Sequence, residues 1–127
     1  MPEPDDQLER LRSICLGLPE VTERPSHSAP TWFVRGKSSF VMFWGNGHHG
    51  NQFPHLWCAA PPGVQEELVD TEPLRFFRPP YVGGRGWVGV RLDVDPDWAE
   101  IARICQEAYR VVAPRRLVDL LDRPGLS

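Results

Sequence analysis

Hydrophobic and polar residues alternate most regularly near the middle of the second half of the chain. The apolar positions are Val88, Val90, Leu92 and Val94, and the positions between them are Trp87, Gly89, Arg91 and Asp93. A period of two is typical of a β-strand with one face on the core. We therefore expect a strand over 87–94 that carries Trp87 and Arg91 on its outward face.

A helical period follows this strand. Asp95 is expected to cap a helix with Pro96 at its first position, where the fixed φ of proline fits. The expected buried stripe consists of Trp98, Ile101, Ala102, Cys105, Ala108 and Val112. The charges on the opposite face alternate in sign at helical spacing. This pattern predicts a helix to Val112, and Pro114 precedes a last helix over 115–121.

The first half of the chain predicts one helix followed by strands. Asp6 and Glu9 form a capping box, and the apolar face behind it consists of Leu8, Leu11, Cys15 and Leu18. Two apolar runs, 31–34 and 39–44, flank a turn that contains Gly36 and predict a β-hairpin. Further strands are expected over 21–24 and 56–60, a short helix over 64–70, and loops over 45–54 and 73–86.

Segregated strands and helices favour an α+β fold, in which the first helix and the 95–112 helix cover an antiparallel sheet of about five strands. The length of 127 residues, with 41% hydrophobic residues, fits one domain over 1–127 with a compact core.

The start, MPEPDDQLERL, is acidic and lacks the features of a secretory signal. No apolar run is long enough to span a membrane. We expect a soluble, cytoplasmic monomer without a membrane partner.

Residues that could carry chemistry do not form a catalytic or metal-binding pattern. Cys15, Cys58 and Cys105 form no paired motif and are expected to be buried free thiols. His48 and His49 are adjacent and have no carboxylate near them in the sequence, and a catalytic imidazole needs an orienting acid. The glycines at 45–47 and 83–86 fit turns better than phosphate-binding loops. We predict no metal, no cofactor, no catalytic residues and no enzymatic activity.

The charge distribution is uneven. Fourteen basic and 17 acidic residues give a net charge of −3, which disfavours an indiscriminate nucleic-acid binder. However, no acidic residue lies between Arg24 and Gln65, or between Leu74 and Leu92. The pair Arg115–Arg116 lies in the first turn of its helix, where the dipole disfavours cations. These two arginines are expected to pair with an acid elsewhere or with an external anion.

Five segments of the chain have a recognisable sequence: LGLPEV (16–21), FVRGKSSF (33–40), LWCAAPPGVQ (56–65), FRPPYVGGRGWVGVRL (77–92) and AYRVVAPRRL (108–117). In this order and spacing they resemble the MmcQ/YjbR family of small bacterial proteins. The resemblance covers nearly the whole chain. It implies an α+β fold with a curved antiparallel sheet whose hairpins form a "double wing", similar to a phage transcription-factor domain. It also implies DNA binding, on the basis of that likeness of fold.

The functional hypothesis is a nucleic-acid-binding surface on the hairpins. The basic residues of the acid-free stretches lie on β elements, and β-ribbons can enter a groove of DNA. The candidate binding residues are Arg35, Lys37, Arg85, Trp87, Arg91, Arg110, Arg115 and Arg116. The net charge requires that the acidic residues of both termini face away from this surface.

The alternative is a pocket for a small molecule or a protein partner. Its candidate lining is aromatic and consists of Trp32, Trp44, Trp57, Tyr81 and Trp87, with His48 and His49 in the neighbouring loop. An aromatic groove with arginines scattered elsewhere would favour this alternative. Packing in the core of the sheet is the competing explanation for each tryptophan.

Overall fold

The computed structural model describes residues 4–45 and 53–122. The helices are α1 (Pro4–Leu16), α2 (Val64–Thr71), α3 (Trp98–Val112) and α4 (Arg115–Asp122), and a 3₁₀ turn, η1, spans Gly83–Arg85. The strands are β1 (Val21–Ser26), β2 (Ala29–Val34), β3 (Ser38–Trp44), β4 (His55–Cys58), β5 (Phe76–Phe77) and β6 (Val88–Arg91). No helix in these ranges is both long enough and apolar enough to cross a membrane.

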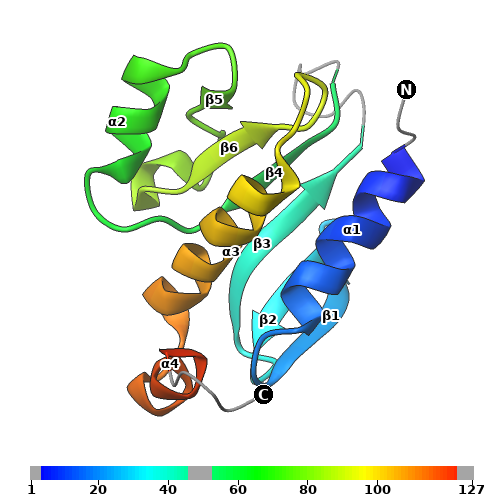
Figure 1. Cartoon of the computed structure of the whole chain (residues 1–127), viewed down its shortest axis with the longest axis vertical. Helices are drawn as coiled ribbons and strands as arrows, with labels where there is room; N and C mark the ends of the chain where they lie inside the picture. Colours follow the sequence, from blue (N-terminus) through cyan, green and yellow to red (C-terminus); the bar gives the residue numbers. More distant parts are fainter. Residues whose placement is uncertain (1–3, 46–52, 123–127) are drawn as a thin grey trace.

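The described strands form one antiparallel sheet in the order β1-β2-β3-β4-β6-β5 (Figure 1). This confirms the predicted α+β class, the hairpin around Gly36 and the strand before α3. The register between β2 and β3 shifts between Trp32 and Phe33. Such a bulge increases the local twist and bend of a sheet.

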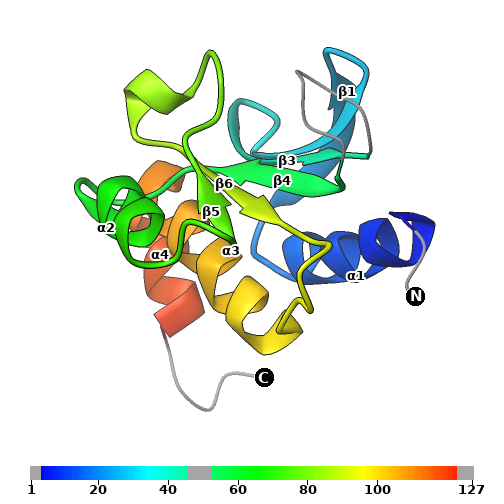
Figure 2. The same ribbon diagram turned by 90° about the horizontal axis from the view of Figure 1, so that it is seen from above.

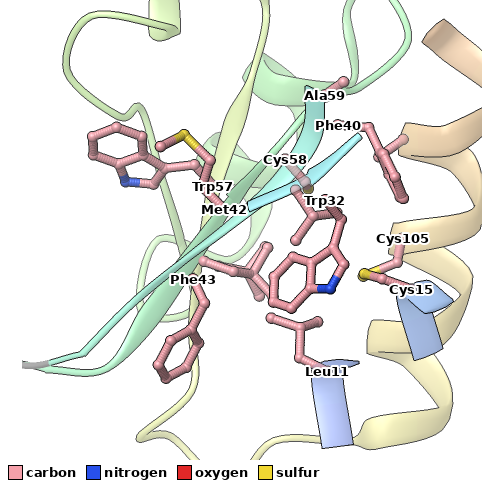
Figure 3. Packing of buried hydrophobic residues seen from close by; sticks show 14 of the residues in the cluster. Leu11, Cys15, Trp32, Phe40, Met42, Phe43, Trp57, Cys58, Ala59 and Cys105 are labelled. Carbon is pink, nitrogen blue, oxygen red and sulfur yellow. The ribbon is translucent and has the colours of Figure 1, made fainter. Parts of the chain in front are cut away.

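Helices α1, α3 and α4 lie on one side of the sheet, as Figure 2 shows. The core between these two layers contains Trp32, which points toward Leu11, Cys15 and Cys105 (Figure 3). Burial raises the pKa of the Cys15 thiol, as it does for Cys58. All three cysteines are buried and free, which confirms the prediction for them.

The tryptophans are divided between the two faces of the sheet. Met42 and Trp57 lie on the side away from α1 and α3, opposite Trp32 (Figure 3). They are direct cross-strand partners in the β3–β4 pair. The chain therefore has a second apolar layer on the face that these helices leave open.

Two predicted helix starts differ from the structure. Helix α1 begins at Pro4, before Asp6. Helix α3 is capped by Asp97, whose side chain accepts hydrogen bonds from the backbone N–H groups of Ala99 and Glu100. Asp95 lies outside the helix with φ 42°, so Pro96 is not its first residue. Asp95 and Asp97 are both suitable N-cap residues for this helix. Asp97 takes the position, because its side chain accepts from the backbone N–H groups that the first helical turn leaves unpaired.

The strand before α3 also differs from its prediction on both faces. Val94, expected in the core, is exposed, because β6 ends at Arg91. Trp87, expected to face outward, is only 3% exposed. Within the segment predicted as a loop over 73–86, Phe76 and Phe77 add the short edge strand β5. The ring of Phe77 lies against the backbone of Gly89, so the outward face of β6 is covered as well.

Candidate ligand-binding groove

The open face of the sheet carries a groove of about 760 Å³. Its floor comes from β3 and β4, where Met42, Trp44 and Trp57 share one face, as the alternation in a strand requires. The rings of Trp44 and Trp57 are 4.7 Å apart between centroids, with 48° between their planes. The two tilted rings give the floor an apolar, aromatic character.

One wall of the groove is the loop around η1. Tyr81, Val82, Arg85 and Trp87 line this wall. The buried amide of Gln65, on α2, holds the loop: its Nε2 donates to the carbonyl oxygens of Gly83 at 2.8 Å and Trp87 at 2.5 Å. A side chain from a separate helix therefore fixes the shape of this wall.

The turn between β1 and β2 contributes the opposite wall. Figure 2 shows this hairpin and the loop around η1 rising from the same side of the sheet, away from α1 and α3. Ser26, His27 and Ser28 line the groove here, and Ser39 adds a third hydroxyl from β3. The lining thus combines an apolar floor with hydrogen-bonding groups, which is the usual composition of a small-molecule site.

The structure does not bring the eight predicted nucleic-acid-binding residues together. Arg35 and Lys37 flank Gly36 in the β2–β3 turn, and Arg115 and Arg116 begin α4. Figure 1 shows that this turn and α4 lie toward the same end of the molecule. Arg85 and Trp87 belong to the groove, and Arg110 lies on α3.

Three of the predicted cations are neutralised by carboxylates. Arg35 Nε is 3.0 Å from Glu20 Oε1. Arg91 binds both carboxylate oxygens of Asp93 and holds the pKa of that carboxyl below its usual range. Arg110 donates to Asp122 at 2.7 Å and also pairs with Glu107. These pairs reduce the positive field available to a nucleic acid.

The aromatic alternative is partly realised in the geometry. Trp44, Trp57, Tyr81 and Trp87 line one groove, and Trp32 lies beneath the helices. All four tryptophans are also buried members of the hydrophobic core, as the competing explanation expected. His48 and His49 lie outside the described residues. No group of three or more His, Cys, Asp or Glu residues with metal-binding geometry occurs within 4–45 and 53–122.

Met42 and the β1–β2 turn are parts of the groove that were not predicted from the sequence. The signal for Met42 was present, since it alternates with Trp44 along β3 and so shares its face. The turn could not be assigned, because His27 and Ser28 are more than 50 positions from the η1 loop in the sequence and meet it only in the folded chain.

The fold is that of a small α+β protein with an antiparallel sheet. The sequence matches the YjbR family over residues 16–111, so the chain belongs to that family. A similar solved structure is the crystal structure of Deinococcus radiodurans protein DR2400, with a DUF419 domain. It has 20% sequence identity and a TM-score of 0.69, covering 98% of this chain and 94% of that one. No curated protein matches the chain.

Proposed function

We propose that the protein is a non-catalytic binding module that takes a small molecule with a flat apolar ring into the groove. The observation that carries the proposal is the layer of Met42, Trp44 and Trp57 on a sheet face that α1 and α3 leave open. A volume of about 760 Å³ is within the range of small-molecule sites. The described lining residues offer stacking surfaces and hydroxyl groups, and none of them is a carboxylate that could orient His27.

Filling the groove tests this proposal. Ser39 lines the groove from β3, and its neighbour Ser38 is exposed and does not line it. Naphthalenemethanol, a neutral bicyclic probe, should quench the tryptophan fluorescence of the wild type. The variant Ser39→Phe should lose this binding because the added ring occupies the groove, and the matched variant Ser38→Phe should keep it. Equal binding by both variants would contradict the proposal.

A second candidate function is nucleic-acid binding, as proposed for the eight residues above. Lys37, Arg115 and Arg116 favour it, because they are exposed and have no ion pair with any residue of 4–45 and 53–122. Such cations can approach phosphates without first breaking a salt bridge.

Salt-dependent binding distinguishes this second candidate. With about four phosphate contacts, affinity for duplex DNA should fall with salt at a log–log slope of about −3.6. The double variant Lys37→Glu, Arg85→Glu reverses two charges. It should weaken binding to all DNA sequences and flatten the slope of affinity against salt. A fluorescence-anisotropy titration that finds no duplex or single-strand binding at low ionic strength would reject it.

A further inference from the structure

One unneutralised cation lies in the aromatic groove. Arg85 is exposed, and its guanidinium carbon is 5.2 Å from the ring centroid of Trp87. No carboxylate of the described residues is within ion-pair distance of it, and none lines the groove. Contact with the ring orients the guanidinium and leaves its N–H donors available to an anion.

A second hollow of the surface contains an arginine, Arg91, whose pairing differs from that of Arg85. It measures about 550 Å³ and also contains aromatic and arginine side chains, among them Phe53, Phe77 and Arg91. There the guanidinium of Arg91 lies 4.0 Å from the Phe53 ring centroid and binds Asp93 through two hydrogen bonds. Arg91 is therefore already paired with a carboxylate of the protein, whereas Arg85 pairs with no carboxylate of the described residues. Another arginine of this hollow, Arg78, donates to the neutral side chain of Gln65 at 3.3 Å.

The rim of the groove is held in an unfavourable backbone conformation. His27, Ser28 and Tyr81 have φ values of 52°, 67° and 65°, a region that L residues with side chains rarely adopt. A two-residue hairpin turn of this kind favours Asn-Gly, yet this chain has His-Ser. Tyr81 is 82% exposed beside the groove. Three further described non-glycine residues with positive φ lie outside the groove, so these values fix the shape of the rim and do not by themselves mark a ligand site.

We propose that the groove selects an aromatic ring that carries an anionic group, a carboxylate or a phosphate. The ring lies on the floor of Met42, Trp44 and Trp57, and the anion binds the Arg85 guanidinium on the adjacent wall. This inference rests on the proposed function, because it names the chemical class of the groove's ligand. It adds a charge requirement that the aromatic floor alone does not impose.

Three probes that share one ring system test the charge requirement. They are naphthoate, naphthyl phosphate and neutral naphthalenemethanol, each titrated by isothermal calorimetry. Both anions should bind the wild type more tightly than the alcohol. Arg85→Gln should weaken the anions by about tenfold or more, the size of a lost charge-assisted hydrogen bond, and leave the alcohol unchanged. Arg85→Lys, which keeps the charge, should restore part of the loss.

Arg10→Gln is the matched control, since Arg10 is an exposed arginine on α1 that does not line the groove, and its guanidinium carbon lies 5.6 Å from the ring centroid of Trp98. It should bind all three probes as the wild type does. The charge requirement is wrong if the alcohol binds as tightly as the anions, or if Arg85→Gln binds naphthoate with unchanged affinity. If none of the three probes binds the wild type, the proposed function fails along with it. Of the two anions, the tighter binder identifies carboxylate or phosphate as the preferred group.

Discussion

Gln65 is the side chain on which the wall of the groove depends most directly. It is buried on α2, and its Nε2 is hydrogen-bonded to the carbonyl oxygens of Gly83 and Trp87. Leucine has a similar size but cannot donate, so Gln65→Leu leaves both carbonyl groups without this partner. The expected cost is about 1–3 kcal/mol of unfolding free energy, with weaker binding of naphthalenemethanol.

Urea unfolding followed by tryptophan fluorescence measures the effect of this change. Gln106→Leu is the control, because Gln106 is a partly exposed glutamine on α3 outside the groove lining. Equal unfolding free energies for the two variants would show that the Gln65 hydrogen bonds do not stabilise the loop.

At the residue scale, sequence patterns predicted burial better than they predicted partners. The stripe on α3 correctly included Ile101, Cys105 and Ala108. It omitted Tyr109, which is fully buried and donates its hydroxyl to the carbonyl oxygen of Pro19 at 2.8 Å. That partner lies 90 positions away in the sequence, so no local pattern indicates it. A tyrosine can be buried once its hydroxyl finds such an acceptor.

At the scale of elements, the pairing of β5 with β6 depends on a glycine. A Cβ added at Gly89 would overlap the ring of Phe77, which lies directly over it. Gly89→Ala should therefore displace Phe77 and destabilise the protein by about 1–3 kcal/mol. Gly45→Ala should have a much smaller effect, because nothing lies within 4 Å of a Cβ at that position.

A double-mutant cycle shows whether the Phe77 ring is the cause. If it is, Gly89→Ala should cost clearly less in a Phe77→Leu background than in the wild type, as measured by chemical denaturation. An equal cost in both backgrounds would mean that backbone effects at Gly89 account for the loss.

Long elements were predictable from their periodicity, and short ones were not. The hairpin around Gly36 and helix α3 each repeat their pattern over several residues. Strand β5 has only two residues, which is too short for any period, and both are aromatic. It is defined by pairing with β6, a contact between segments that the sequence does not place side by side.

At the scale of the whole molecule, the candidate site was only half predictable. Four of the five tryptophan and tyrosine residues proposed for a pocket line the groove. Trp44 and Trp57 come from β3 and β4, where alternation predicts the shared face, and Tyr81 and Trp87 come from the loop around η1. The charge pattern was less informative. Arg35 lies in the first acid-free stretch, yet it pairs with Glu20, which is 15 positions away. An acid-free stretch of sequence therefore does not imply an unpaired cation once the chain is folded.

The paired carboxylates predict how stability depends on pH. Arg12 on α1 makes two hydrogen bonds to Glu23 on β1, at 2.7 and 2.8 Å, and Trp32 Nε1 donates to the same carboxylate. The hydrogen bond from Arg12 is the main reason that the pKa of Glu23 lies below its usual range. Asp93 and Asp122 have lowered pKa values for the same kind of reason, through Arg91 and Arg110.

A carboxyl with a lower pKa in the folded state binds fewer protons there than in the unfolded state. Its contribution to stability is complete above the unfolded pKa, about 4.3 for Glu, and is lost as the pH falls through the folded value. The unfolding free energy should thus decrease steadily below about pH 5.

Glu23→Gln should lower the unfolding free energy by about 0.5–1 kcal/mol at neutral pH and make its dependence on acid pH shallower. Glu67→Gln, an exposed change on α2, should alter neither. Urea unfolding at a series of pH values measures both quantities, and a Glu23→Gln curve parallel to that of the wild type would rule out this linkage between α1 and β1.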